Sequence, residues 1–217
     1  MRYDDNHKER TRARVLAEAA AAIRGKGVER VGVAEVMAGA GLTHGGFYAH
    51  FPSRQALLSE AIAQLAAESH GVKRLSRQPD APAALAGFLE HYLSTGHCER
   101  RLGACPLPIL LPEADALPPE ARATTRRLVS RLTDRLGEVL ADLGRASPRA
   151  DARRLLAESI GLITLARAEP DRSLREEHLA RAREDLLAAY GALRAPQEDQ
   201  APTASRSIAD RLGGAGR

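Results

Sequence analysis

The sequence predicts an all-α protein in which a small N-terminal domain precedes a larger helical domain. Ala, Leu, Arg and Glu dominate the 217 residues, whereas aromatic residues make up only 3%. The four dominant residue types favour helices, and no segment combines β-branched or aromatic residues with the strict alternation of a strand. Glycine and proline divide the chain into segments whose apolar residues recur at helical spacing.

Four helices are expected in the N-terminal part of the chain. Gly27 and Gly41 end the first two, because glycine is the usual residue after a helix. Thr43 and Ser53 are suitable N-caps for the third and fourth, and Pro52 ends the third. Apolar periodicity places the four helices at residues 8–24, 33–40, 44–51 and 54–65.

The third of these helices carries two adjacent glycines, Gly45 and Gly46. Each glycine inside a helix costs about 1 kcal/mol relative to alanine. Phe47 and Phe51 stand four residues apart, so their rings share one helical face and are expected to anchor the helix by packing. We expect the missing side chains to let the helix backbone approach a partner closely.

The domain boundary is expected in the polar stretch at residues 70–82. This predicts domains at 1–70 and 71–194, followed by a tail at 195–217 that is expected to be disordered, because it lacks apolar periodicity. Five prolines in residues 103–119 predict short helical turns there. Further helices are expected at residues 83–95, 120–143, 148–168 and 173–193, with Ser147 as the cap of the third.

Charge is concentrated near the N-terminus. The whole chain has a net charge of +4. Residues 1–54 contain nine basic and six acidic side chains, so they account for +3 of this charge. Lys8, Arg10, Arg12 and Arg14 could lie along a phosphate backbone. The start of the chain has no apolar leader and no segment is long and apolar enough for a membrane span, which predicts a cytoplasmic protein.

The second and third helices, joined by a short turn containing Gly41, match the helix-turn-helix pattern. Met37 departs from it, since a small residue normally stands where the two helices cross. Residues 8–62 resemble the DNA-binding domain of the TetR family of bacterial transcriptional regulators, with an AcrR-like helix-turn-helix. The motifs that carry the resemblance are 11–16, Ala19-Ala20, Gly27, 33–36, 40–43, 46–54 and Leu57-Leu58.

The resemblance implies a homodimer that binds a palindromic double-stranded operator and usually represses transcription. His44 and Gly45 would face bases, while most of the other matching residues would contact phosphates. Arg54 stands where the family usually has Lys, and Gly32 where it usually has Ser or Thr, which puts one phosphate contact in doubt. The expected DNA-binding residues are Arg10, Arg12, Thr43, His44, Gly45, Gly46, Tyr48, His50 and Arg54.

The last two long helices are expected to form the dimer interface. Each is strongly apolar on one face, and both faces are too large to be buried in one body of this size. The expected interface residues are Leu156, Ile160, Ile163, Leu179, Leu186, Leu187 and Tyr190.

An unknown small-molecule inducer is expected in the second domain, where Phe88 and Tyr92 are candidate pocket residues. Cys98 and Cys105 are candidate sensing thiols, because Arg100 and Arg101 could lower a thiol pKa. Two other interpretations stay open: both residues are ordinary buried cysteines, or they form a metal site with His91 and His97.

The sequence predicts a regulator that is not an enzyme and needs no cofactor. It contains no Gly-rich phosphate loop, no HExxH motif and no catalytic triad spacing. Two alternatives stay open: a DNA-binding regulator or activator without an inducer, and a thiol enzyme using Cys105 with His97 or His91. A metal site made by His44 and His50 is disfavoured, because six residues apart on one helix they face different sides.

Overall fold

The computed structural model describes residues 2–76, 78–99 and 103–191. Within these ranges every regular element is a helix, which confirms the all-α class. The predicted disordered tail lies outside the described residues. The elements are α1 (Arg2–Lys26), α2 (Val33–Gly39), the 3₁₀ helix η1 (His44–Ala49), α3 (Arg54–Glu68), α4 (Gly71–Ser76), α5 (Ala81–Tyr92), α6 (Thr95–Cys98), α7 (Leu107–Leu110), the 3₁₀ helix η2 (Ala114–Ala116), α8 (Pro119–Asp142), α9 (Pro148–Ala168) and α10 (Arg172–Gly191).

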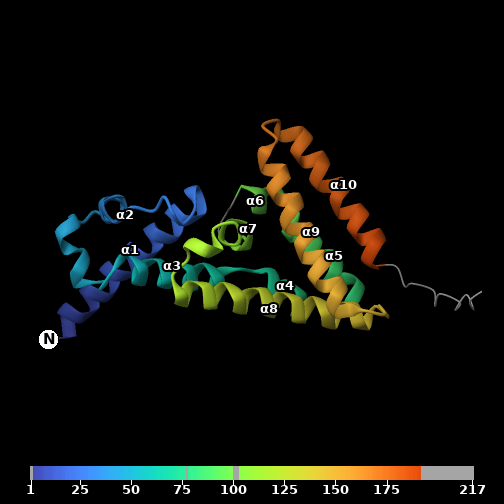
Figure 1. Ribbon diagram of the computed structural model, residues 1–217, viewed down its shortest axis with the longest axis horizontal. Helices are drawn as coiled ribbons and strands as arrows, with labels where there is room; N and C mark the ends of the chain where they lie inside the picture. The colour runs from blue at the N-terminus through green and yellow to red at the C-terminus, as the bar shows by residue number, and fades with distance from the viewer. Residues whose placement is uncertain (1, 77, 100–102, 192–217) are drawn as a thin grey trace, which may run out of the picture.

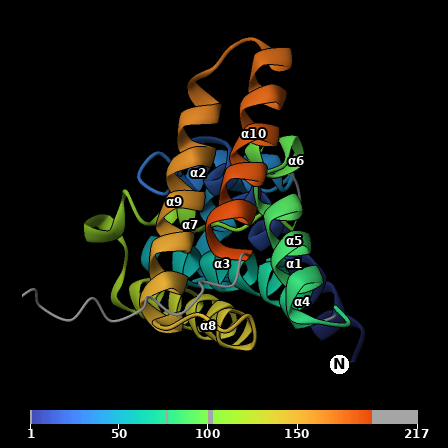
Figure 2. The same cartoon turned by 90° about the vertical axis from the view of Figure 1, so that its right-hand side faces the viewer.

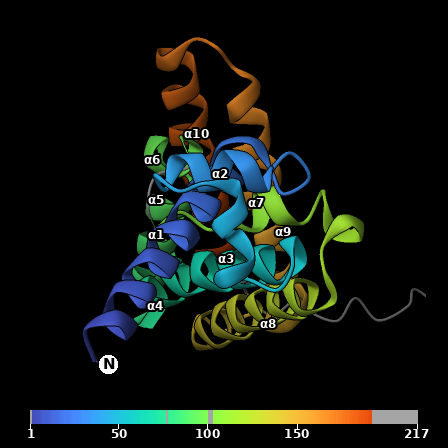
Figure 3. The ribbon, with the colours of Figure 1, turned by 90° about the vertical axis from the view of Figure 1, so that its left-hand side faces the viewer.

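The helices form two groups joined by a long helix (Figure 1). We call α1, α2, η1 and α3 the head, and the helices from α4 onwards the body. The helix α8 runs below both groups and contacts α3, α4 and α9. At the far end of the body, α9 and α10 form an antiparallel pair, and α10 also contacts α5 (Figure 2). From the opposite end, the head helices face the viewer and α8 lies beneath them (Figure 3).

The head has its own apolar core, which confirms the inward face predicted for Phe47 and Phe51. Their side chains are 2% and 0% exposed. This head core also includes residues of α7, of the segment after η2 and of the start of α8. Its members are Val15, Ala19, Ala20, Ile23, Val28, Val31, Val36, Met37, Ala40, Phe47, Phe51, Leu57, Leu58, Ala61, Ile62, Leu65, Ile109, Leu110, Leu117 and Ala121.

The proline-rich segment forms short helical turns, as predicted, and it ties the body to the head. Glu113, between α7 and η2, accepts hydrogen bonds at Oε2 from the backbone N–H of Val28, at 2.6 Å, and of Glu29, at 3.1 Å. Gly27 has a φ of +86°, and a Cβ there would overlap Glu113 Oε1. The turn after α1 is therefore held by a carboxylate that lies about eighty residues later in the chain.

Two differences from the expected helices have local causes. The region 70–82 contains α4, whose Gly71 packs closely on α8: a Cβ at Gly71 would lie 3.1 Å from Leu132 Cδ2. The predicted helix at 83–95 instead ends at Tyr92. It ends there because Ser94 Oγ donates to His91 O at 2.8 Å and accepts from His97 N at 3.1 Å, which starts α6.

The predicted caps are only partly correct. Ser53 Oγ accepts from Ala56 N at 3.1 Å, so the cap of α3 is confirmed. Thr43 and Ser147 occupy the N-cap positions of η1 and α9, but neither side chain accepts a hydrogen bond from its helix. The prediction of side-chain capping at these two positions is wrong.

The premise of the dimer prediction is also wrong. Both apolar faces of α9 and α10 are largely buried within the single chain, because α5, α8 and these two helices pack into one body core. Of the seven expected interface residues, Ile160 and Leu187 are half-buried. The other five are buried without a partner: Leu156, Ile163, Leu179, Leu186 and Tyr190.

Candidate nucleic-acid interface

The turn between α2 and η1 gives the head its helix-turn-helix shape. Gly41 adopts a φ of +69°, a left-handed conformation that glycine reaches without strain. The backbone N–H of Gly41 donates to Ala38 O and that of Leu42 to Met37 O, both at 2.9 Å, which closes the end of α2. The chain then enters η1 at His44, two residues after Leu42.

The second helix of this motif is a 3₁₀ helix instead of the expected α-helix. Gly46 N donates to Thr43 O at 3.1 Å and His50 N to Phe47 O at 3.0 Å, the three-residue spacing of a 3₁₀ turn. Two adjacent glycines lower the preference for regular α-helix, and 3₁₀ geometry is common in such short pieces. The rings of Phe47 and Phe51 stack at a centroid distance of 5.9 Å and hold η1 against the head core.

The opposite side of η1 is open to solvent. Tyr48 is 72% exposed, although its ring lies edge-on to Phe47 at 5.2 Å. His44 and Gly45 are exposed, and no atom lies within 4 Å of the position that a Cβ at Gly45 would occupy. The side chains of Tyr48 and His44 and the backbone at Gly45 are therefore all accessible to a partner.

The two glycines of η1 differ in their surroundings. Gly46 is half-buried, and a Cβ there would lie 3.8 Å from Met37 Cε and 3.9 Å from Thr43 Oγ1. Met37 itself is fully buried where α2 crosses η1. Gly46 therefore faces Met37, the large residue that departs from the usual pattern, whereas Gly45 faces outward.

Arg54 is engaged inside the head. Its guanidinium donates to the carbonyl oxygens of Val31, at 3.0 Å, and of Val28 and Glu29, both at 3.1 Å. These bonds fix the loop before α2 and use donors that a phosphate would need. Its predicted phosphate contact stays a prediction.

The remaining predicted DNA-binding residues lie on the same part of the head. Arg12 forms an ion pair with Glu60, and its guanidinium lies 4.7 Å from the centre of the Phe51 ring. Arg10 and Thr43 are exposed. His50 is half-buried, and its Nδ1 has no hydrogen-bond partner among the described residues.

In the body, the predicted pocket residues lie within the core. Phe88 and Tyr92 are both fully buried, with ring centroids 5.2 Å apart. Tyr92 also lies against His97, at a centroid distance of 4.3 Å. Among the described residues, Tyr92 OH, Ser69 Oγ, His91 Nε2 and both ring nitrogens of His97 are buried without a hydrogen-bond partner. We call Ser69, His91, Tyr92, His97 and Cys105 the polar cluster.

The polar cluster does not activate Cys105. Burial raises the pKa of the Cys105 thiol, and the nearby hydroxyls of Tyr92 and Ser69 oppose this only in part. Arg100 and Arg101, which were expected to lower a thiol pKa, lie outside the described residues. Burial lowers the pKa of His97 to about 4, and the charge of Arg167 adds to this effect. Cys105 and His97 are therefore both favoured in their neutral forms, which contradicts a reactive thiol at Cys105 and a thiolate–imidazolium pair.

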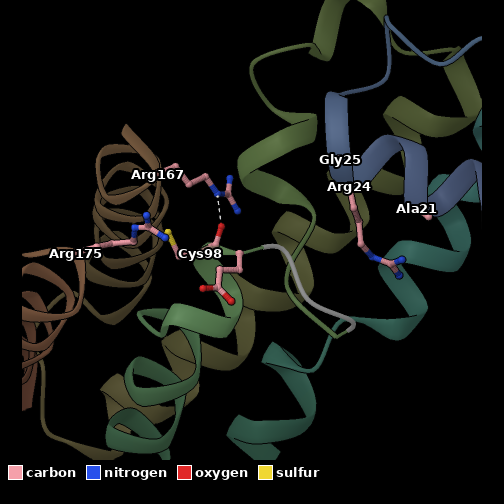
Figure 4. A pocket seen from close by; sticks show the side chains of 7 residues that line it. Ala21, Arg24, Gly25, Cys98, Arg167 and Arg175 are labelled. Carbon is pink, nitrogen blue, oxygen red and sulfur yellow. Dashed lines mark hydrogen bonds between the residues drawn. The ribbon is translucent and has the colours of Figure 1, made fainter. Parts of the chain in front are cut away.

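Cys98 has a different setting, at a pocket of about 580 Å³ between the head and the body (Figure 4). Arg167 donates to Cys98 O at 3.0 Å and to His97 O at 3.3 Å, which holds the end of α6. Figure 4 shows the guanidinium of Arg175 beside the Cys98 side chain. The Cys98 residue is only 4% exposed. The lining residues are Ala21, Arg24, Gly25, Cys98, Glu99, Arg167 and Arg175.

No metal site is apparent in residues 2–76, 78–99 and 103–191. These ranges contain no group of three or more His, Cys, Asp or Glu side chains placed to hold a metal ion. Nor does any helix in them have the length and apolarity required to cross a membrane.

Comparison with known proteins agrees with the geometry of the head. Residues 15–61 match the family described as bacterial regulatory proteins, tetR family. No curated protein matches the chain. A TetR-family regulator from Agrobacterium tumefaciens is similar in structure, with a TM-score of 0.74 and 20% identity over 85% of this chain and 100% of the other.

Two further solved structures show the same likeness. SCO4454, a TetR-family regulator from Streptomyces coelicolor, has a TM-score of 0.66 and 21% identity over 83% of this chain and 96% of its own. The reduced form of Escherichia coli NemR has a TM-score of 0.66 and 18% identity over 80% of this chain and 96% of its own. At these identities the likeness shows a shared fold.

A helix-turn-helix head on an all-α body is the architecture of the DNA-binding transcriptional regulators to which this chain is similar. Residues 15–61 therefore match the TetR family, and the described residues share the fold of solved TetR-family regulators.

Proposed function

We propose that the protein is a cytoplasmic, homodimeric repressor that leaves a palindromic operator when its body binds a small molecule or is modified at a thiol. One observation carries the DNA-binding part: η1 is anchored from behind by Phe47 and Phe51 and presents Tyr48, His44 and Gly45 to solvent. A helix held in this way can enter the major groove without losing its attachment to the head.

In this proposal His44 and the backbone at Gly45 read base edges. Tyr48 donates its hydroxyl to a phosphate, and Thr43, His50, Arg10 and Arg12 contact the backbone on either side. Two heads must stand about 34–36 Å apart to read two half-sites, so the repressor acts as a dimer.

The path from body to head runs through the proline-rich segment. Ile109, Leu110, Leu117 and Ala121 lie in the head core, and Glu113 holds the turn after α1. A ligand that moves the start of α8 therefore also moves the head. Both thiols are buried, but Cys98 is the better sensing candidate, because it lines a pocket whereas burial raises the pKa of Cys105. The similarity to the reduced form of NemR supports a test of these thiols.

The DNA-binding proposal is tested by footprinting the DNA upstream of the protein's own gene. His44→Ala and Tyr48→Ala are expected to weaken protection by at least about fivefold each, since base and phosphate contacts are worth about 1–3 kcal/mol. Arg153→Ala removes an exposed side chain from α9, away from η1, and serves as the control. Binding of both head variants at the wild-type affinity would reject this face of η1.

The same footprint, measured after addition of N-ethylmaleimide, tests the proposed release by thiol modification. The Cys98 sulfur adds to one alkene carbon of the reagent and the proton goes to the other, so nothing else is consumed. Release of wild type and Cys105→Ser, but not of Cys98→Ser, is the expected pattern. If the Cys98→Ser variant is released from DNA as readily as wild type, this cysteine is not the sensor. The proposal of DNA binding is then judged by the footprints of the head variants alone.

A regulator or activator without an inducer is the alternative. It predicts that neither a small molecule that binds the body nor a thiol reagent changes the footprint. A thiol enzyme is opposed by the buried, neutral Cys105 and His97.

A further inference from the structure

A second pocket, of about 450 Å³, lies on α4 and is lined by side chains that can all donate hydrogen bonds. They are His70, Lys73, Arg74 and Gln78, which we call the basic pocket. None of the four is acidic, so the lining carries a clear excess of positive charge. Its volume falls within the range of small-molecule sites.

Two of these side chains lie close to glycines from other parts of the body. A Cβ at Gly103, which has a φ of +85°, would lie 2.5 Å from His70 Nδ1. A Cβ at Gly87, in α5, would lie 2.9 Å from Gln78 Nε2. His70 N also donates to Gly103 O at 3.1 Å. The walls of the pocket therefore depend on the absence of side chains at these two glycines.

The positive charge of the basic pocket is not neutralised from within the described chain. Lys73 and Arg74 are exposed, and neither forms an ion pair with a carboxylate of the described residues. Behind them, the ring of His91 lies 6.1 Å from that of His70, with its Nε2 buried and without a partner in the described structure. Burial, Arg74 and His70 together lower the pKa of His91, so it adds a neutral donor or acceptor instead of a charge.

We propose that the basic pocket binds a small polyanion carrying phosphate or carboxylate groups. An arginine offers a planar pair of donors and a lysine a compact charge, and both suit such oxygens. His70 and Gln78 add donors from positions that Gly103 and Gly87 keep open. This site differs from the inducer and thiol sites in residues 83–143.

The position of α4 links the basic pocket to both parts of the molecule. It follows α3 of the head after two residues, and its Gly71 packs against Leu132 of α8. A bound anion would pull Lys73 and Arg74 together and stiffen this connection.

The proposal is tested by isothermal titration of the full chain with inorganic pyrophosphate and, separately, with citrate, at constant ionic strength set by potassium chloride. At least one of the two is expected to bind wild type, and the comparison shows whether phosphate or carboxylate is preferred. Lys73→Gln/Arg74→Gln should weaken that binding at least tenfold. Arg172→Gln/Arg181→Gln removes the same charge from exposed positions of α10 and should bind as wild type.

A second variant separates the shape of the pocket from its charge. Gly87→Ala places a methyl group against Gln78, and it should weaken the same binding at least threefold while the melting temperature stays equal or rises, because alanine favours helix. Gly161→Ala, in α9, has nothing within 4 Å of its new methyl group and is the control. Equal affinity in Gly87→Ala and Gly161→Ala would overturn the assignment of Gln78 and its glycine to the site.

Two results would overturn the proposal as a whole. One is that neither anion binds wild type above the chloride background. The other is that Lys73→Gln/Arg74→Gln leaves anion binding unchanged but lowers the salt dependence of DNA binding by about two phosphate contacts, which would make the basic pocket part of the DNA interface.

Discussion

At the scale of single residues, the polar cluster is the least expected feature of the body. A core that buries Tyr92 OH, Ser69 Oγ and both ring nitrogens of His97 without partners among the described residues carries a cost, because buried polar groups are normally hydrogen-bonded. The sequence shows each residue but not this convergence, since Ser69, Tyr92, His97 and Cys105 come from three separate segments.

The neutral state of His97 predicts a pH-dependent stability. Its pKa of about 4 lies below the value of 6.5 for an exposed histidine, so between these values the unfolded chain takes up a proton that the folded chain does not. Stability is therefore present above pH 6.5 and is lost as the pH falls. Between pH 7 and pH 5 the loss in the free energy of unfolding should be about 2 kcal/mol.

Urea denaturation at both pH values checks this. His97→Phe should remove most of the dependence, whereas His178→Phe, which replaces an exposed histidine, should keep it. His91, Arg167, Tyr92 and Cys105 surround position 97 in the wild type and in both variants, so all three proteins contain these groups. The same slope in His97→Phe and wild type would show that His97 is not the group responsible.

At the scale of elements, apolar periodicity predicted the long helices well because one face of each packs on a core. Apolar periodicity failed where a single contact determines where a helix begins or ends. The end of α5 is set by the hydrogen bonds of Ser94, and Gly71 of α4 packs closely against Leu132, a contact that no local pattern reveals. The sequence shows the two adjacent glycines of η1. Only the structure shows that Gly45 faces solvent while Gly46 faces Met37.

This difference predicts opposite effects of the same substitution at the two glycines. Gly45→Leu should fold with nearly unchanged stability but bind the operator at least about tenfold more weakly, because its side chain would stand between the backbone and the groove. Gly46→Leu should lower the free energy of unfolding by about 1–3 kcal/mol, because it crowds Met37. Urea denaturation and footprint titration of each variant separate the two effects. Normal operator binding by Gly45→Leu would contradict the proposed close approach.

At the scale of the whole molecule, the dimer surface has to be redrawn. Most of the leucines and isoleucines expected there are buried inside one chain, because α8 supplies a partner face that an argument from α9 and α10 alone omits. The large apolar side chains that stay exposed on these helices are Leu165, at 72%, and Leu174, at 44%. Leu165 lines a groove of about 420 Å³ together with Leu162, Ala166 and Leu179 among others. We propose that the contact of the proposed dimer lies on this outer face of α9 and α10.

Leu165→Lys should therefore weaken self-association at least about tenfold, because the ammonium group would lose water in the interface. Leu111→Lys makes the same change at another exposed leucine and should leave the dimer intact. Size-exclusion chromatography with light scattering gives the mass directly, against 23.3 kDa for one chain. A wild-type monomer, or a dimer that tolerates Leu165→Lys, would contradict this placement.

The head core has a consequence for how such a regulator can be taken apart. Ile109, Leu110, Leu117 and Ala121 complete a core whose other members all lie before residue 66. A fragment ending at the predicted boundary of residue 70 would leave that apolar surface open to water. The head is therefore not expected to fold as a separate domain. A chimera that joins this head to the body of another regulator has to include residues 107–121.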